Sequence, residues 1–343
     1  MLQPNQASEP LAQASLQQLQ ERFPLPPGWT SHETFLQEAS VGSLTLFMVG
    51  LVAASGERQA MGASADADGY PVNRAYFELL ERISIQEANQ PARWLDVRNA
   101  RGEVLEQRPS TRVFPRDLSP QRRRALSNGV ALHESWEQAC ASALNELIER
   151  DRVLRSFAGE LTPVRLQTPE TRLARATTEL FETAVYELGQ REPAPKHRTA
   201  LWFMMPQQLE LPLTYGFGTA QSLPEAIARA EREAMQRLAF LWGEELPSEQ
   251  VEATPTPDFH QEYYLYPPNH ARLTEWLAGQ RRPRHALQRS LPLFDGERVT
   301  FIDLTPAALR GKLVVAKAAS PCARQLRFGS PAFPRDAAPH PVV

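Results

Sequence analysis

The stretch ALNELIERD, residues 143–151, carries the charged pattern Glu-x-x-Glu-Arg within a long run of helix-forming residues. Positions i, i+3 and i+4 lie on one face of a helix, so Glu146, Glu149 and Arg150 present two carboxylates and a cation together. We therefore expect one helix face to concentrate charge at this point of the chain.

This helix is predicted to span residues 136–157, because Ser135 and Gln138 have the spacing of a capping box. Leu147 and Ile148 flank the polar stripe and give the helix apolar character around much of its circumference. Such a helix should be largely buried, and a buried carboxylate must be paired or coordinated to a cation. The pattern therefore favours a site over a solvated surface.

Two other predicted helices carry nearly the same pentapeptide. One begins at Pro71 and continues through residue 83, and the other is capped by Ser222 and Glu225 and reaches Trp242. In the latter, Arg229 lies one turn before the pattern on the same face. The two pentapeptides contribute Glu78, Glu81 and Arg82, and Glu233, Gln236 and Arg237.

Clustered Glu oxygens suit Mg²⁺, which prefers oxygen ligands and often bridges carboxylates to substrate phosphates. Arginines between them would bind phosphate oxygens in a bidentate manner. Together the three helices indicate a nucleoside-triphosphate site without a glycine-rich phosphate loop. Ordinary surface charge, or internal salt bridges, is the alternative that periodicity leaves open.

The remaining pattern predicts antiparallel hairpins that alternate with helices, the order typical of an α+β protein. A short helix is expected at residues 10–22. Residues 106–127 are expected to be irregular, 243–260 a surface loop, and the chain after residue 329 an extended proline-rich tail. Strands are expected at residues 43–54, 58–64, 199–205, 211–218, 298–304 and 312–318.

The composition excludes several classes of protein. A net charge of -3 gives no general attraction to nucleic acid, and the basic run at residues 122–124 is interpreted as a solvated loop. Two cysteines without metal-site spacing argue against a zinc centre. No apolar run is long enough to span a membrane, so we expect a cytoplasmic protein with no direct nucleic-acid role.

The sequence resembles the YcaO family over most of its length, from about residue 43 onward. Residues 63–84, 127–151 and 216–237 carry the resemblance in that order, and residues 317–329 and 339–341 are similar to the family's closing strand and proline-rich terminus. The resemblance implies a YcaO-like α+β fold with antiparallel sheets and helices layered around a central nucleotide site. The domains it implies are an N-terminal helix and linker (1–42), a catalytic domain (43–330) and an extended tail (331–343).

The resemblance also implies the cofactors ATP and Mg²⁺ and a set of site residues. Five glutamates would hold Mg²⁺ or order its waters, while Arg150 and Arg229 would face the phosphates and Arg82 and Gln236 would support them. His340, Pro341 and Val343 in the tail are the candidates for a direct part in catalysis. The glutamates are Glu78, Glu81, Glu146, Glu149 and Glu233.

The activity implied by the resemblance is ATP-dependent cyclodehydration of a ribosomally made precursor peptide. A Cys, Ser or Thr side chain attacks the preceding carbonyl, the amide oxygen is phosphorylated and leaves, and a thiazoline or oxazoline forms. A thioamide- or amidine-forming enzyme is the first alternative. A non-catalytic scaffold is the second, motivated by Arg74 in place of a small residue and by a loop at residues 66–69 that lacks the family's lysine.

The partners follow from the same resemblance. Residues 1–42 are too short for a packed leader-binding domain, so we expect an E1-like or winged-helix protein that recognises the leader peptide. A flavin-dependent azoline dehydrogenase could act downstream, and a homodimer or larger complex is expected.

Overall fold

The computed structural model describes residues 8–115, 120–190, 195–280, 293–329 and 338–342. The chain divides into two compact units, which are described separately. The first comprises residues 1–115, 129–144 and 299–319, and the second comprises 116–128, 145–298 and 320–343.

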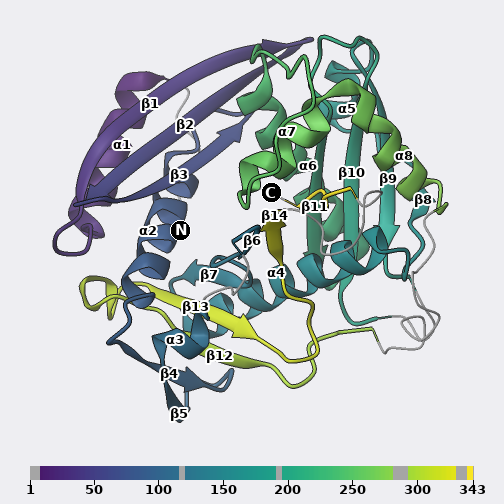
Figure 1. Cartoon of the computed structure of the whole chain (residues 1–343). Coiled ribbons are helices and arrows are strands. Elements are labelled where there is room, and N and C mark those ends of the chain that lie inside the picture. The colour runs from purple at the N-terminus through teal and green to yellow at the C-terminus, as the bar shows by residue number, and fades with distance from the viewer. Residues whose placement is uncertain (1–7, 116–119, 191–194, 281–292, 330–337, 343) are drawn as a thin grey trace. The chain divides into compact units, whose positions relative to one another are not determined.

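The first unit begins with a helix and a three-stranded antiparallel sheet in the order β1-β2-β3 (Figure 1). Helix α2 packs on this sheet, and Gly62 permits the close approach: a Cβ there would lie 2.1 Å from the carbonyl oxygen of Ala75. Buried Leu51, Tyr76 and Leu80 belong to the core between them. The elements are α1 (Glu9–Arg22), β1 (Thr30–Val41), β2 (Leu44–Ser55), β3 (Arg58–Asp66) and α2 (Val72–Ala88).

Strand β1 corrects the expectation of a linker before residue 43. It pairs with β2 from Thr30 opposite Ala54 to Val41 opposite Leu44. Most of its side chains are exposed, so its sequence lacks the apolar alternation of a half-buried strand. The two hairpin strands expected after it, with their turn at residues 55–57, are confirmed.

The first unit also contains a five-stranded antiparallel sheet in the order β5-β4-β12-β13-β7. The two strands expected near residues 298–304 and 312–318 are confirmed as neighbours within it. Residues 106–113, expected to be irregular, instead lie in a strand and a short helix. The elements are β4 (Trp94–Arg98), β5 (Val104–Pro109), α3 (Ser110–Val113), β7 (Val130–His133), β12 (Thr300–Asp303), a 3-10 turn η3 (Ala307–Leu309) and β13 (Val314–Ala319).

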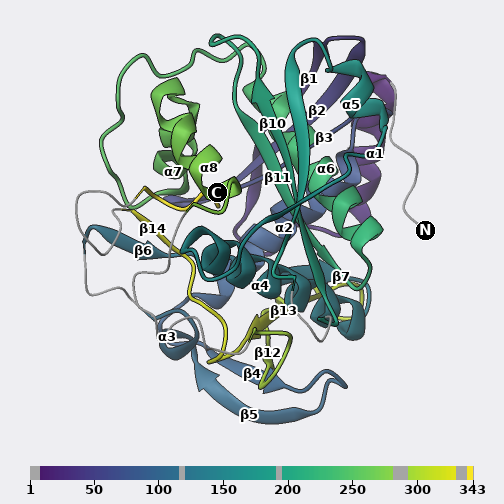
Figure 2. The same cartoon turned by 90° about the vertical axis from the view of Figure 1, so that its right-hand side faces the viewer.

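The second unit is built on a four-stranded antiparallel sheet in the order β11-β10-β9-β8 (Figure 1). Figure 2 shows its strands β10 and β11 from the side. The expected hairpin is confirmed, with Trp202 opposite Gly216. Helix α6 follows, and the hydroxyl oxygen of Ser222 accepts a hydrogen bond from the Glu225 N–H at its start, as expected. The elements are β8 (Val164–Leu166), α5 (Arg172–Ala176), β9 (Phe181–Leu188), β10 (Arg198–Pro206), β11 (Thr214–Ala220) and α6 (Leu223–Leu241).

The long helix α4 (Trp136–Phe157) has the bounds that its capping box predicts. The hydroxyl oxygen of Ser135 accepts a hydrogen bond from the backbone N–H of Gln138 at 3.3 Å and donates one to its side-chain oxygen at 3.1 Å. Residues 136–144 belong to the first unit and 145–157 to the second. Among the described residues, no helix is long and apolar enough to cross a lipid bilayer.

Two short helices and a two-stranded ribbon complete the second unit. Residues 257–260, assigned to a surface loop, begin a helix in which Phe259 and His260 are buried. The basic run at residues 122–124 is a strand and not an irregular loop. The elements are β6 (Arg122–Arg124), α7 (Pro257–Leu265), η1 (Pro267–Asn269), α8 (His270–Leu277) and β14 (Arg327–Gly329).

Candidate functional site

The polar face of α4 carries Glu146, Glu149 and Arg150, as expected. Arg150 lies 3.6 Å from Glu149 and 3.8 Å from Glu146, measured between nitrogen and oxygen atoms. Only 14% of the Arg150 side chain and 10% of the Glu149 side chain are exposed. The surface-charge alternative therefore does not describe this helix, because its charged face is withdrawn from solvent.

Burial changes the protonation of this cluster. It raises the pKa of Glu149 to about 8, with Glu233 and Glu146 acting in the same direction and Arg150 opposing them. Burial likewise raises the pKa of Glu233, and its attraction to Arg150 is the largest opposing effect. These mutual effects place Glu146, Glu149, Glu233 and Arg150 in one electrostatic cluster within the second unit.

Glu233 is positioned by close packing of α6 on β11. A Cβ at Gly216 would lie 2.3 Å from the carbonyl oxygen of Ala230, so only glycine allows the two elements to approach. The Glu233 carboxylate accepts a hydrogen bond from the backbone N–H of Phe217, which lowers the pKa of the acid. One oxygen of the Glu233 carboxylate thus pairs with a backbone N–H of the edge strand β11.

Arg229 and Gln236 lie on the same helix as Glu233. Arg229 donates to the Glu225 carboxylate at 2.7 Å and to the Thr219 carbonyl oxygen at 3.2 Å, and 39% of its side chain is exposed. Its charge also lowers the pKa of Glu149, so it acts on the cluster from nearby. Gln236 is partly buried.

Arg237 is the residue that sequence analysis left out of the candidate site. It is 9% exposed, and its guanidinium carbon lies 4.2 Å from the centre of the Tyr215 ring. Its charge lowers the pKa of Glu233. The signal was present in the pentapeptide itself, because Arg237 holds the position that Arg150 holds in α4.

In the first unit, α2 presents the remaining candidates. Glu78 accepts a hydrogen bond from the backbone N–H of Ala63 at 3.2 Å and pairs with Arg82 at 3.1 Å. Glu81 accepts one from the backbone N–H of Leu132 at 3.2 Å. About a third of the Glu78 side chain is exposed. Their proposed part in a nucleotide site stays a prediction.

The two units share a local motif. In each, a glycine on a strand meets the backbone of the following helix, and a glutamate of that helix accepts the next strand N–H. The pairs that correspond are Gly62 with Gly216, Ala63 with Phe217, Glu78 with Glu233, Glu81 with Gln236, and Arg82 with Arg237. The repeated pentapeptide therefore reflects a repeated strand-helix unit.

The tail residues 338–342 pack into the second unit. His340 Nε2 donates to the Arg327 carbonyl oxygen at 2.8 Å, and the Tyr264 hydroxyl donates to the Pro339 carbonyl oxygen. Burial lowers the pKa of His340 to about 3, with His260 and Arg150 acting in the same direction. Pro341 is buried, and Val343 lies outside the described residues. Catalytic roles for these three remain predictions.

The donor chemistry of the cluster fits a magnesium nucleotide. No group of three or more carboxylate, His or Cys side chains is arranged to hold a metal ion within the described parts of the chain. Mg²⁺ usually keeps several waters and takes one or two carboxylates together with substrate phosphates, so a ready-made cage is not required. The carboxylates of Glu149 and Glu233 would supply hard oxygen ligands, and Arg150 would donate hydrogen bonds to a phosphate.

The departure at Arg74 has a structural account. Arg74 forms an ion pair with Asp66 and donates to the Ala65 carbonyl oxygen at 3.2 Å. The arginine and the aspartate-bearing loop thus compensate each other locally. This pairing weakens the motivation for the scaffold alternative.

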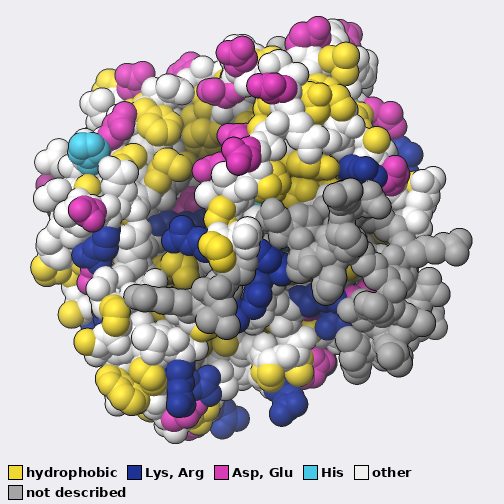
Figure 3. All heavy atoms as spheres, in the orientation of Figure 1, with side chains coloured by type: hydrophobic (Ala, Val, Ile, Leu, Met, Phe, Trp, Pro, Cys, Tyr) yellow, Lys and Arg dark blue, Asp and Glu magenta, His cyan; other side chains and the backbone are white. Residues whose placement is uncertain are grey.

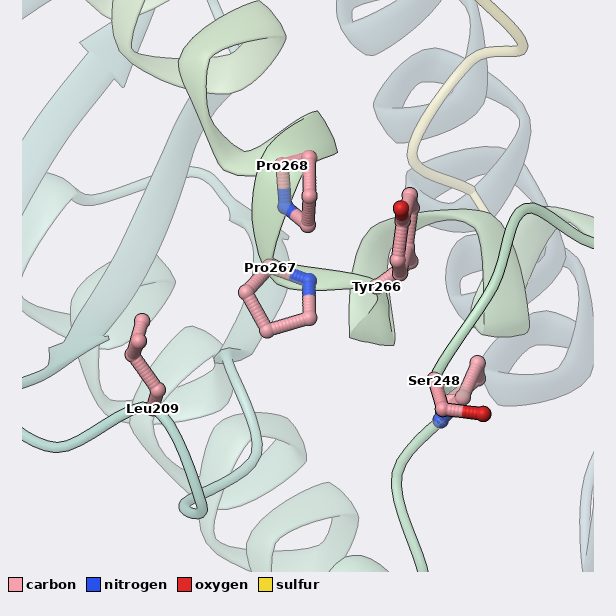
Figure 4. Close-up of a pocket in the computed structure, with 6 residues that line it drawn as sticks. Leu209, Ser248, Tyr266, Pro267 and Pro268 are labelled. Atoms are coloured by element: carbon pink, nitrogen blue, oxygen red, sulfur yellow. The ribbon is translucent and has the colours of Figure 1, made fainter.

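A separate groove of about 550 Å³ lies in the second unit (Figure 4). It contains no charged side chain and so lacks the ligands that a magnesium nucleotide needs. On the face drawn in Figure 3, side chains of both charges are interspersed. The groove is lined by Leu209, Pro247, Ser248, Tyr266, Pro267 and Pro268.

Comparison with known families gives one match. The model of the family described as YcaO cyclodehydratase, ATP- and Mg²⁺-binding, matches residues 87–323, more than half of the chain. The match confirms the resemblance inferred from sequence and the expected cofactors, ATP and Mg²⁺. The matched segment includes α4 and α6. Most of α2 and the whole of the tail lie outside it. No curated protein sequence matches the chain.

Solved structures confirm the fold. YcaO from Methanopyrus kandleri, bound with AMPPCP and Mg²⁺, is 16% identical with a TM-score of 0.56, and the alignment covers 90% of each chain. A heterocyclase in complex with substrate and cofactor is 16% identical (TM-score 0.55), and the alignment covers 95% of this chain but 54% of the heterocyclase. The E. coli microcin synthetase McbBCD complex with pro-MccB17 bound is 13% identical (TM-score 0.53; 88% and 89% covered).

Proposed function

Because the chain belongs to the YcaO family, we propose that it is an ATP-dependent cyclodehydratase acting on a ribosomally made precursor peptide. It would convert Cys, Ser or Thr residues into thiazolines or oxazolines. The observation that carries the proposal is the buried cluster of Glu149, Glu233 and Arg150 in the second unit. Buried carboxylates with raised pKa values beside a guanidinium suit the binding of a magnesium nucleotide.

The residues of the cluster have distinct proposed roles. Glu146, Glu149 and Glu233 would hold Mg²⁺ or its waters, and Arg150 and Arg229 would bind the phosphates. Glu78, Glu81, Arg82 and Gln236 complete the proposed set on the strength of the family resemblance. The bound cation would neutralise charge on the triphosphate, and the arginines would stabilise the charge that develops during transfer.

The proposed reaction balances without a further reactant. The side-chain sulfur or oxygen of the substrate residue attacks the preceding carbonyl carbon and loses its proton. The former carbonyl oxygen takes the γ-phosphoryl group of ATP, with release of ADP. Elimination of that oxygen as phosphate and loss of the amide proton form the C=N bond of the azoline, so the peptide loses one water.

Partners are part of the proposal. The similar McbBCD structure is a complex with pro-MccB17 bound, and the similar heterocyclase is a complex with substrate and cofactor, which supports a partner-dependent peptide substrate here. We propose an E1-like or winged-helix protein for leader recognition, with a flavin-dependent dehydrogenase downstream and a homodimer or larger assembly. His340 and Pro341, held in the second unit, would help to position the substrate, and Val343 is included from the resemblance alone.

The test is an assay with ATP, Mg²⁺, the genetic neighbour that encodes a leader-binding protein and a Cys- or Ser-rich precursor encoded beside it. Products lighter by one water per azoline, with one ADP formed for each, would support the proposal. Exchange of oxygen for sulfur in the presence of sulfide would select the thioamide alternative. Failure to bind Mg·ATP even in the presence of the partner would favour the non-catalytic scaffold. Glu149→Gln serves as the inactive control.

A further inference from the structure

Arg237 is a buried cation with two unpaired N–H donors. It is 9% exposed, and its Nε and Nη2 atoms have no hydrogen-bond partner among the residues that the structure describes. A buried guanidinium with unsatisfied donors is costly. Native proteins rarely leave such donors unused, and the exceptions are often ligand sites.

The equivalent arginine of the first unit shows that the local motif does not require this arrangement. Arg82 occupies the same position on α2 and pairs with Glu78 at 3.1 Å, four residues earlier. Arg237 also has a glutamate four residues earlier, yet Glu233 uses its carboxylate on the Phe217 N–H. Arg237 lies instead over the ring of Tyr215. The Nε and Nη2 donors of Arg237 are therefore not used in an ion pair with Glu233.

The free donors form one edge of the guanidinium. Nε and Nη2 direct their N–H bonds in parallel, the geometry that binds two oxygens of a phosphate or carboxylate at once. Stacking on Tyr215 fixes the plane of the group, with 4.2 Å between the guanidinium carbon and the ring centre. The edge is therefore oriented before a ligand arrives, which reduces the entropy lost on binding.

The charges nearby favour phosphate over a free carboxylate as the ligand. Glu233 lies one turn before Arg237, and Glu146 and Glu149 belong to the same cluster. A bare carboxylate would meet repulsion from these acids, whereas a triphosphate arrives with Mg²⁺ that they can bind. We propose that Arg237 binds a phosphate group of the nucleotide through its Nε and Nη2 edge, an inference that rests on the proposed function.

The experiment measures binding of AMPPCP with Mg²⁺ by calorimetry to the full chain and to Arg237→Met and Arg237→Lys. Loss of a bidentate charged contact should weaken binding about 10- to 100-fold in both variants. Binding of AMP, which lacks the outer phosphates, should change much less. Arg232→Met on the exposed side of the same helix is the matched control and should bind like the wild type.

Thermal unfolding distinguishes this role from packing alone. Arg237→Met removes the unpaired charge and keeps an apolar side chain against Tyr215, so its melting temperature without nucleotide should equal or exceed that of the wild type. A lower melting temperature with unchanged AMPPCP affinity would show a structural role and overturn the inference. Equal weakening for AMPPCP and AMP would do the same. Wild-type protein that does not bind AMPPCP with Mg²⁺ would overturn the proposed function itself.

Discussion

His260 of α7 and His340 of the tail contact each other directly. Nδ1 of His260 donates to the carbonyl oxygen of His340 at 2.8 Å, and the ring centres lie 4.2 Å apart. Nε2 of His260 accepts from the Gly329 N–H at 3.0 Å, so the imidazole is neutral. Burial lowers the pKa of His260 to about 4 and that of His340 to about 3. Both rings therefore stay neutral in the folded chain while they titrate normally when unfolded.

Acidification should destabilise the second unit through this pair. Both folded pKa values are depressed, so the unfolded chain takes up protons first as the pH falls below about 6.5. Between pH 7.5 and 5.5 the two histidines together should lower the free energy of unfolding by about 2 to 3 kcal/mol. Glu149 acts in the opposite direction over this range, so the change is measured by urea denaturation as the difference between the wild type and His340→Gln at each pH. This difference should shrink as the pH falls, and a constant difference would show that His340 titrates equally in both states.

Tyr264 should stabilise the chain through the tail alone. Tyr264→Phe removes the hydroxyl that donates to the buried Pro339 carbonyl oxygen, at a cost of about 1 to 2 kcal/mol. In a chain truncated after residue 329 the same substitution should cost less, because the Pro339 carbonyl oxygen is gone. Denaturation of the four proteins completes the cycle. Tyr263→Phe is the matched control, and additive costs in the cycle would disprove the coupling.

Glu149→Gln should separate stability from function. The amide removes a buried acid whose pKa is raised to about 8, so the metal-free variant should melt at a higher temperature than the wild type at pH 8. A raised folded pKa means that wild-type stability falls as the pH rises from about 4.5 to 8, and the variant should lose this fall. Mg·ATP turnover should disappear.

Glu137→Gln, on the exposed start of the same helix, provides the control for the glutamate substitution. It should change neither the melting temperature nor turnover. Equal melting temperatures for wild type and Glu149→Gln across pH 6 to 9 would show that Glu149 ionises freely, and would remove the argument from burial.

The sequence predicted the helices and strands whose ends are set by residues at those ends. The start of helix α4 was predicted because its capping box is a local signal that lies at the first turn of the helix. Strand β1 was missed because its stability comes from pairing with β2 while its side chains stay exposed. Helix α7 was missed because its acidic, proline-bearing sequence resembles a loop, although tertiary packing buries Phe259 and His260.

The site was predictable only in part, for the same reason. Repetition of the pentapeptide indicated Glu149, which is buried, and Glu233, which is half-buried, and desolvation raises the pKa of both. Arg237 could not be distinguished from Arg82 by sequence, because the difference lies in which partner each reaches in three dimensions. Periodicity identifies which residues share a face, but it does not say which of them keeps unpaired donors.

Gly216 should be the most sensitive position of the strand-helix motif in the second unit. A Cβ at this position would lie 2.3 Å from both the Ala230 carbonyl oxygen and the Ala234 nitrogen, which are backbone atoms that can move only with the whole helix. Gly216→Ala should therefore cost about 3 kcal/mol or more and displace Glu233 from the Phe217 N–H. Gly56→Ala in a turn meets no atom within 4 Å and should cost roughly 1 kcal/mol for its positive φ. Denaturation midpoints of both variants measure the difference, and equal costs would mean that α6 can shift away from β11 without loss.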